Sequence, residues 1–499
     1  MTRRGAETVV IGSGVSGMLV ARELVRAGRR VTVLERGSLV PWEEQIRRQG
    51  WEGDGPTSAH NHECDPAGQH RPWQYVYGVG GTSNSWSGNS PRLLPEDFET
   101  HSRHGVARDW PISYDELDAY YARAEAALGI AGNSNGIMPG ASYPLPAHPP
   151  SPLDELLAPL LDPFIPMPQA RASVPVRGRE ACNGSASCTL CPVDARFSVL
   201  NGLPDVLADP GVELLDETIA ARLVPRDGRV AAVECVRGNG ERLTLEADRF
   251  VVAANAIESA GLLLRSGIDH GDTGRNLLDH THAYLIVHTE GRVGPGRGAT
   301  WSTGASYAYY SGDFRSERAG ILIYPWNGGA PVPNDTVVRA LVEGRRGPAL
   351  REAIVRDWEG MFKLVASPDE LPSPDSRVTL SSRKDAFGMP LNLVHAIEPS
   401  DYQRQAVGHL VDDLPRRLAP LGVRKVDMTW PAGVGAHLLG TLRMGTDADA
   451  VVDADGRHAR FENLFVSGGA VFPSMSPAHP TLTIAALAIR LGEQLAAPA

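Results

Sequence analysis

Two histidines near the C-terminal end of this 499-residue chain have side chains suited to proton transfer. His437 opens the segment His437-Leu438-Leu439-Gly440-Thr441, and His479 opens His479-Pro480-Thr481. An imidazole titrates near neutral pH, so it can take up or release a proton under ordinary conditions. An arbitrary histidine among the fifteen in this chain is more often a structural residue. A catalytic role for the pair therefore depends on the motifs around it.

A glycine-rich segment near the other end has the spacing of a dinucleotide fingerprint, Gly12-Ser13-Gly14-Val15-Ser16-Gly17. It follows the β-branched run 8–11 and opens an amphipathic stretch, which predicts a strand, a glycine turn and a helix. The glycines permit a tight turn, a close approach of backbone to a pyrophosphate and close helix-strand packing, while the N-terminus of the helix attracts phosphates. The pattern predicts a bound dinucleotide. The alternative is a glycine-rich turn without a ligand.

A second predicted strand, 30–34, ends at Glu35. A carboxylate in that place can accept hydrogen bonds from an adenosine ribose, and it would repel the 2′-phosphate of NADP. Glu35 is therefore a candidate cofactor ligand.

Three cysteines fall within ten residues, Cys182, Cys188 and Cys191, and Pro192 follows them. Such spacing is typical of thiolates that converge on an iron-sulfur cluster from a loop. A loop of free thiols or a local disulfide would account for it as well. Zinc usually requires a fourth ligand, and none is adjacent in the sequence.

The elements that must position these residues alternate between helix and strand. Besides the first two strands, the buried-strand signals are 249–255, after a hairpin-like pair around Gly228 and 238–240, and 463–466, which runs into the small-residue turn 467–470. A last helix is predicted over 481–495. From 281 to 430 the pattern changes to alternating strands with helical stretches near 337–343 and 402–418. The predicted fold class is α/β, or α+β overall.

Composition and charge exclude several classes of protein. The length exceeds what one core usually supports, and 42% hydrophobic residues suffice for two domains. A formal net charge of -11 argues against nucleic acid or an anionic membrane as the main partner, because both require a basic surface. No apolar run is long enough to span a bilayer, and no targeting segment precedes the first strand. We therefore expect a cytoplasmic enzyme.

The chain resembles the glucose-methanol-choline (GMC) oxidoreductases, a family of FAD enzymes that oxidise alcohols, and it looks most like the bacterial sugar and glycoside oxidases and dehydrogenases. Besides the fingerprint and Glu35, the resemblance rests on the segments 78–84, 108–114, 274–280, 437–445 and 463–487. It implies a Rossmann-like FAD-binding domain built from both ends of the chain, 1–280 and 431–499. The middle of the chain, 281–430, would form a substrate-binding domain on an antiparallel sheet.

The resemblance also implies roles for individual residues. His437 matches the catalytic base that takes the hydroxyl proton as hydride leaves for flavin N5, and His479 matches the residue that holds the substrate oxygen. His280 would lie near the cofactor without being the base. The N-terminus of the helix at Thr481 would stabilise negative charge on the reduced flavin. The cofactor-binding residues implied by the fingerprint and the other motifs are Gly12, Gly14, Val15, Ser16, Gly17, Glu35, Gly80, Gly81, Asn84, Ala254, Gly469, Ala470 and Thr481.

Three further expectations follow from the resemblance. Some relatives attach FAD through a histidine at the position of Ser85, so non-covalent FAD is predicted here. A segment similar to the cysteine loop carries a three-iron cluster in some bacterial sugar dehydrogenases, although the last cysteine gap is one residue longer there. The electron acceptor, whether oxygen, a quinone or a redox protein, stays open, as do the exact sugar or polyol substrate and the oligomeric state. A lyase that keeps FAD as a structural group on this scaffold is the alternative function.

Overall fold

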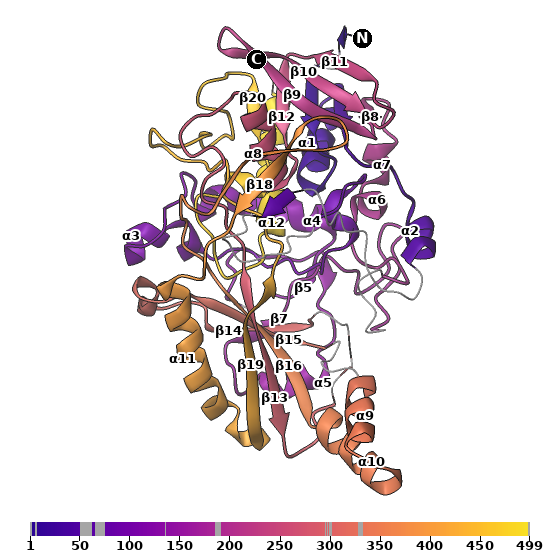
Figure 1. Ribbon diagram of the computed structural model, residues 1–499, viewed down its shortest axis with the longest axis vertical. Coiled ribbons are helices and arrows are strands. Elements are labelled where there is room, and N and C mark those ends of the chain that lie inside the picture. Colours follow the sequence, from indigo (N-terminus) through magenta and orange to yellow (C-terminus); the bar gives the residue numbers. More distant parts are fainter. Residues whose placement is uncertain are drawn as a thin grey trace.

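A parallel sheet of five strands forms one half of the molecule (Figure 1). The computed structural model describes residues 2–4, 7–49, 62–64, 75–134, 136–184, 191–294, 296, 298, 302–327 and 333–497. The strand order is β20 (Leu464–Val466), β12 (Arg249–Val252), β2 (Thr8–Ile11), β3 (Val31–Leu34) and β8 (Val212–Leu215), and all neighbours run parallel. Sequence-distant segments thus meet in one sheet, because β20 from the C-terminal end pairs with β12, which pairs with β2.

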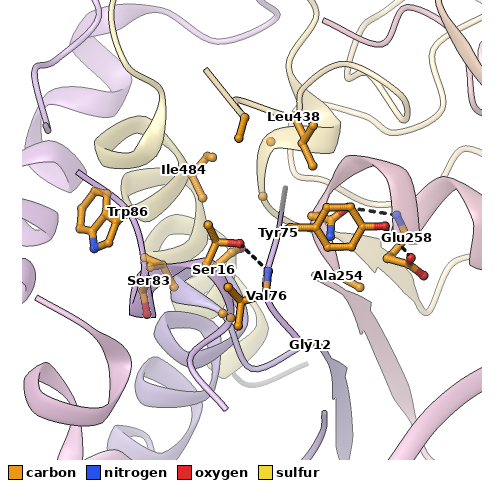
Figure 2. A pocket seen from close by; sticks show the side chains of 18 of the residues that line it. Gly12, Ser16, Tyr75, Val76, Ser83, Trp86, Ala254, Glu258, Leu438 and Ile484 are labelled. Atoms are coloured by element: carbon orange, nitrogen blue, oxygen red, sulfur yellow. Dashed lines mark hydrogen bonds between the residues drawn. The ribbon is translucent and has the colours of Figure 1, made fainter. Parts of the chain in front are cut away.

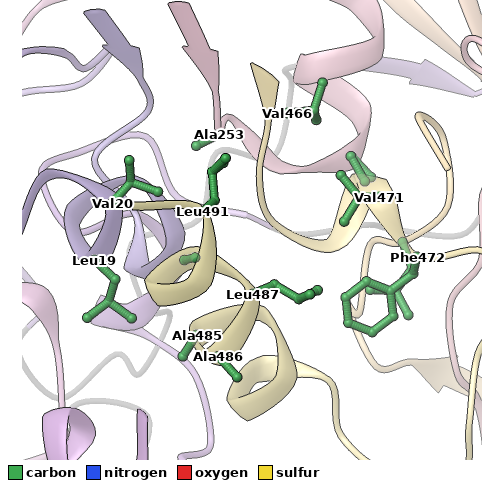
Figure 3. Close-up of a cluster of buried hydrophobic side chains, with 14 of the residues drawn as sticks. Leu19, Val20, Ala253, Val466, Val471, Phe472, Ala485, Ala486, Leu487 and Leu491 are labelled. Atoms are coloured by element: carbon green, nitrogen blue, oxygen red, sulfur yellow. The ribbon is translucent and has the colours of Figure 1, made fainter. Parts of the chain in front are cut away.

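The central strands of this sheet, β12, β2 and β3, are largely buried, and helix α1 (Val15–Arg26) packs on β2 and β3. The same half of the molecule contains α4 (Tyr114–Leu128), α8 (Asn255–Arg265) and α12 (Thr481–Ala496). Helices α1 and α12 pack against each other, and α12 also packs on α4. Figure 3 shows Leu19 and Val20 of α1 in one cluster with Leu487 and Leu491 of α12. Strands covered on both faces read as continuous apolar runs, which explains why they could be predicted from the sequence.

A four-stranded sheet lies beside the parallel sheet. Its order is β1 (Thr2–Arg4), β11 (Arg242–Glu246), β10 (Arg229–Arg237) and β9 (Thr218–Arg226). Strands β9 and β10 form a hairpin that turns at Gly228, which has a φ of +75°. The predicted hairpin is therefore present.

An antiparallel sheet of six strands forms the other half (Figure 1). Its order is β19 (Val423–Val434), β13 (Thr281–Thr289), β16 (Met361–Pro368), β15 (Ile321–Trp326), β14 (Gly304–Tyr309) and β7 (Phe164–Pro166). One face packs against α11 (Asp401–Arg417) through alternate residues such as Leu285 and Leu364. The residues between them point to the opposite face, because successive side chains of a strand alternate.

Two smaller sheets are also present. One has the order β17 (Arg377–Lys384), β18 (Pro390–His395) and β4 (His62–Cys64), and the other pairs β5 (Ala131–Gly132) with β6 (Leu145–Pro146). The remaining elements are α2 (Trp42–Gln49), η1 (Gly81–Asn84), η2 (Pro95–Phe98), α3 (Thr100–His104), α5 (Pro152–Leu157), α6 (Val199–Gly202), α7 (Pro204–Leu207), η3 (Asp313–Ser316), α9 (Pro333–Val342), α10 (Gly347–Ile354), η4 (Val355–Glu359), η5 (Ala419–Leu421) and η6 (Gly469–Val471).

The predicted fold class is confirmed: a Rossmann-like parallel sheet stands beside a second, antiparallel sheet. The division into 1–280, 281–430 and 431–499 stays a prediction, and β7, from outside the middle segment, adds the last strand to the antiparallel sheet. Among the described helices, none combines the length and the apolar character needed to cross a membrane.

Candidate functional site

A cavity of about 820 Å³ lies where the parallel sheet meets the antiparallel sheet. Ile11, Leu34 and Ala253, at the carboxyl ends of three parallel strands, line one part of it. This is the edge at which sheets of this type bind ligands. Figure 2 shows lining residues from opposite ends of the chain around one space, with Gly12 and Ser16 near Ala254, and Leu438 and Ile484 beyond them.

The three fingerprint glycines serve three different needs. A Cβ on Gly12, which has a φ of +109°, would lie 2.5 Å from the carbonyl oxygen of Ala253, and one on Gly17 would lie 2.0 Å from the carbonyl oxygen of Gly12. Gly14 differs, because a Cβ there would meet no protein atom within 4 Å. Gly14 lines the cavity and caps α1 without a side-chain hydrogen bond. The first N–H groups of α1 are thus left for a ligand.

Glu35 lines the cavity at the end of β3, as its predicted role requires. Its carboxylate oxygens accept hydrogen bonds from the backbone N–H and the hydroxyl of Ser13, and from the N–H groups of Gly37 and Gly78. Burial raises the pKa of Glu35, although these bonds oppose the shift. Glu35 therefore ties the fingerprint to two neighbouring loops, and its contact with a ribose stays a prediction.

Of the other predicted cofactor residues, some line the cavity and the rest do not. Those that line it are Val15, Ser16, Gly81, Ala254, Gly469 and Thr481. Gly17, Gly80, Asn84 and Ala470 are buried and do not line it, although each is adjacent in the chain to a lining residue. Asn84 donates from its side-chain amide to the carbonyl oxygen of Val79 and so holds the turn that carries Gly81. The hydroxyls of Ser16 and Ser467 lie 2.7 Å apart, which joins the fingerprint to the C-terminal turn.

The two predicted catalytic histidines meet in this cavity. Both line it, and their ring centroids are 5.0 Å apart with nearly perpendicular planes. His437 follows β19 after Ala436, whose φ of +54° places it in the left-handed region. His479 precedes α12, whose first residue Thr481 also lines the cavity.

Two more histidines complete the cluster. The Nδ1 atoms of His280 and His437 lie 2.7 Å apart, and His280 Nε2 lies 2.9 Å from the carbonyl oxygen of Ser476. His282 lines the cavity from β13. The sequence analysis did not single out His282, but the two-residue spacing from His280 on a strand was a usable signal, because it places both on one face.

All four rings are kept uncharged by burial. Burial lowers the pKa of His280 and of His437 well below the ordinary imidazole range, and the neighbouring histidines add to the effect. Burial lowers the pKa of His479 to about 3 and that of His282 to about 4. At neutral pH the cluster consists of neutral imidazoles, which can accept a proton.

The antiparallel sheet contributes an aromatic wall, which we define as Tyr284, Tyr324 and Trp326. The ammonium of Lys363 lies 3.4 Å from the ring centroid of Tyr284 and 4.4 Å from that of Trp326. Burial lowers the pKa of Lys363 to about 8. This wall could not be predicted from the sequence, because aromatic residues on a strand are more often core residues.

Asn89 is a further cavity residue that the sequence did not reveal. Its side-chain nitrogen Nδ2 lies 3.4 Å from His479 Nε2, and its side-chain oxygen Oδ1 accepts a hydrogen bond from the side-chain amide of Gln169.

Of the three predicted iron-sulfur ligands, Cys182 and Cys191 belong to the described residues and Cys188 lies outside them. The Sγ atom of Cys191 accepts a hydrogen bond from the backbone N–H of Ala195. Within the described part of the chain, no group of three or more His, Cys, Asp or Glu side chains is placed to hold a metal ion. The cluster stays a hypothesis.

The parallel sheet, the glycine turn and the cavity at its carboxyl edge define a dinucleotide-binding protein of the Rossmann-like class. Residues 10–41 match the model of an NAD(P)-binding Rossmann-like domain, and residues 171–282 and 372–488 match two models of the GMC oxidoreductases. The chain therefore belongs to the GMC oxidoreductase family.

Named relatives cover nearly the whole chain. The chain is 32% identical to the 6'''-hydroxyparomomycin C oxidase of Streptomyces lividus, over 98% of this chain and 91% of that one. It is 29% identical to the fructose dehydrogenase large subunit of Gluconobacter japonicus, over 98% and 97%. Pyridoxine 4-oxidase from Mesorbium loti has a similar fold, with a TM-score of 0.66 at 20% identity over 98% of this chain and 99% of that one.

FAD is the cofactor of this family, and the cavity fits it. The space beside Gly14 is open, the N-termini of α1 and α12 both lack side-chain caps, and the lining runs from the fingerprint to the histidine pair. A cavity of this size and elongated lining accommodates a dinucleotide. The protein is thus an FAD-binding oxidoreductase.

Proposed function

We propose that this enzyme oxidises a CH–OH group of a sugar, glycoside or polyol, with His437 as the general base. The observation that carries the proposal is the pair of neutral histidines, His437 and His479, in the same cavity as the dinucleotide fingerprint. An alcohol gives up hydride readily only when its hydroxyl proton is removed, and a positioned base typically contributes about 10²- to 10⁴-fold to such a step.

The two histidines have different tasks in this proposal. His437 takes the hydroxyl proton, since its ring is neutral and Nδ1 is already engaged with His280. His479, whose ring centroid lies 5.0 Å from that of His437, holds the substrate oxygen. When bound, FAD supplies the acceptor for the hydride that leaves the carbon. The uncapped N-terminus of α12 points positive potential into the cavity and favours negative charge there.

The cofactor contacts of the proposal come from residues that line the cavity and from their buried neighbours in the chain. The N-terminus of α1 would hold the pyrophosphate and Glu35 the ribose. The full proposed set is Gly12, Gly14, Val15, Ser16, Gly17, Glu35, Gly80, Gly81, Asn84, Ala254, Gly469, Ala470 and Thr481. Ser85 lines the cavity and has no imidazole to form a bond with the flavin, so the FAD is non-covalent. Acid precipitation should leave the yellow colour in the supernatant; colour in the pellet would contradict this.

The aromatic wall supports a sugar-like substrate. Aromatic faces stack on the apolar faces of sugar rings, and the wall lines the same cavity as the histidine pair. The relatives described above include a fructose dehydrogenase and an oxidase of 6'''-hydroxyparomomycin C. The acceptor that reoxidises the enzyme is oxygen, a quinone or a redox protein. A cluster held by Cys182, Cys188 and Cys191 would favour the redox protein.

The test is the flavin absorbance of the purified holoenzyme, recorded without oxygen before and after addition of single sugars, glycosides and polyols. We expect one class to bleach the flavin bands, and subsequent addition of oxygen or a quinone then identifies the acceptor. A flavin that none of these compounds bleaches would contradict the redox reaction and favour the lyase, which leaves its flavin oxidised. An iron assay on the same sample decides the cluster hypothesis.

A further inference from the structure

A short chain of hydrogen bonds leads from a backbone carbonyl to the proposed base. The carbonyl oxygen of Ser476 lies 2.9 Å from His280 Nε2, and His280 Nδ1 lies 2.7 Å from His437 Nδ1. The two imidazole planes are nearly perpendicular, with ring centroids 4.8 Å apart. Each contact has the length of a normal hydrogen bond, so each must contain one hydrogen.

The carbonyl determines where that hydrogen lies in the first contact. A carbonyl oxygen can only accept, so His280 Nε2 carries the hydrogen and donates it. His280 is fully buried, and burial lowers its pKa well below the ordinary range. A neutral imidazole has a single ring hydrogen, so His280 Nδ1 is bare and can only accept.

The same reasoning determines which ring nitrogen of His437 carries the hydrogen. Because His280 Nδ1 can only accept, the hydrogen between the two rings belongs to His437 Nδ1. The other nitrogen, His437 Nε2, is then bare. It has no hydrogen-bond partner among the described residues, and His437 lines the cavity. The lone pair of His437 Nε2 is therefore available to accept the substrate's proton.

The backbone around both histidines holds the two rings in this relation. Asp279 Oδ1 accepts a hydrogen bond of 2.8 Å from the backbone N–H of His437, and the carbonyl oxygen of His280 accepts one of 2.8 Å from Gly435. The dipeptide 279–280 thus holds the segment 435–437 through both main-chain and side-chain hydrogen bonds. No described carboxylate is hydrogen-bonded to the ring of His437.

We propose that His280 is a positioning residue that fixes the tautomer of His437, so that Nδ1 carries the hydrogen and the bare Nε2 faces the substrate. The proposal rests on the proposed function of His437 as a base. An imidazole here does the work that a carboxylate does in many catalytic pairs, where it orients the base and selects its tautomer. The series of hydrogen bonds ends at the carbonyl of Ser476, which cannot take up a proton. The series therefore orients the base and does not carry the substrate's proton away.

The first test reads the tautomer directly. The holoenzyme is labelled with nitrogen-15 in its histidines, and the resonances of His437 are identified by their loss in His437→Asn. We expect the nitrogen correlations of His437 to show a protonated Nδ1 and a bare Nε2. A protonated Nε2 in the wild-type enzyme would overturn the proposal. This result does not depend on turnover, so it stands whether or not any alcohol reduces the flavin.

The second test compares two substitutions of the positioning residue. In His280→Asn a side-chain amide oxygen can accept from His437 Nδ1, whereas His280→Leu has no acceptor. We expect His280→Leu to lower the limiting rate of flavin reduction by about 10- to 100-fold, the cost found for residues that orient a metal-bound histidine, with flavin content and substrate Kd unchanged. His280→Asn should recover most of the rate, and signals of the other tautomer should appear in His280→Leu alone.

The outcomes separate the two proposals. Equal loss in both variants, or no loss in His280→Leu, would overturn the positioning role. A wild-type flavin that no alcohol bleaches would overturn the proposed function instead, and the nitrogen spectrum would still report the tautomer.

Discussion

The two sheets build the same cavity by different means. The parallel sheet offers backbone: glycines 12, 14 and 17, the first N–H groups of α1, and short turns after each strand. The antiparallel sheet offers side chains: His282, Tyr284, Tyr324 and Trp326 project from alternate positions of β13 and β15. A site made from backbone needs particular residue types at fixed spacing and leaves a motif in the sequence. A site made from alternate side chains on a sheet can change its residues and keep its fold.

This difference separates the expected effects of substitutions. Changes at the junction of the two sheets, where the histidines lie, should abolish chemistry. Changes in the parallel half should weaken cofactor binding, and changes in the antiparallel half should alter the substrate affinity alone.

The largest effect is expected at the junction. His437→Ala should keep its flavin spectrum and lose about 10²- to 10⁴-fold in the rate of flavin reduction, because a positioned base is removed. The measurement is anaerobic stopped-flow reduction by the substrate that bleaches the wild type. His395→Ala is the matched control. His395 of β18 forms a hydrogen bond with Thr379 of β17, and it does not line the cavity. Near-normal reduction in His437→Ala would refute its role.

In the parallel half, Gly14→Ala tests whether the open space beside Gly14 belongs to the cofactor. The protein itself has no atom within 4 Å of the added methyl group, so the fold should be unaffected. A clash with bound FAD should weaken its affinity by about 10- to 100-fold, or about 1.4–2.8 kcal/mol, which lies within the usual cost of overpacking. FAD binding to apoprotein, followed by fluorescence, measures this.

The control for this substitution is Gly408→Ala in α11, where an added Cβ likewise meets no atom within 4 Å. It should bind FAD as the wild type does and be slightly more stable, because alanine favours a helix. Equal FAD affinity in both variants would remove Gly14 from the cofactor site.

In the antiparallel half, Trp326→Ala should raise the KM for a sugar substrate by about tenfold, or about 1.4 kcal/mol, with kcat and flavin content almost unchanged. Trp326→Phe keeps an aromatic face and should retain most of the affinity. An unchanged KM in Trp326→Ala, or a loss confined to kcat, would show that this wall does not bind the sugar ring.

The sequence predicted the parallel half more completely than the antiparallel half. The run 8–11, the fingerprint and the last helix lie where their patterns placed them, because strands buried on both faces and glycine turns have strong local signals. The confirmed family explains why two histidines far from the fingerprint could be selected from fifteen.

What the sequence did not reveal depends on tertiary contacts. The bond between His280 and His437 joins residues 157 positions apart, and Asn89 reaches His479 across 390 positions. Neither has a local signal. Strand β7 joins the antiparallel sheet by pairing with β14, and a strand of three residues is too short to show an alternating hydrophobic pattern.

The central claim is that a histidine kept neutral by burial takes the substrate's proton, and its most direct test is the pH dependence of flavin reduction at saturating substrate. A base acts only when unprotonated, and the pKa of His437 is lowered below the ordinary imidazole value of about 6.5. The other rings facing it, those of His280, His282 and His479, have lowered pKa values too, so none of them adds a positive charge in this range. The account predicts a limiting rate that stays level from about pH 8 down to about pH 6.5 and falls only below that. A rate that already declines at or above pH 6.5 would contradict it.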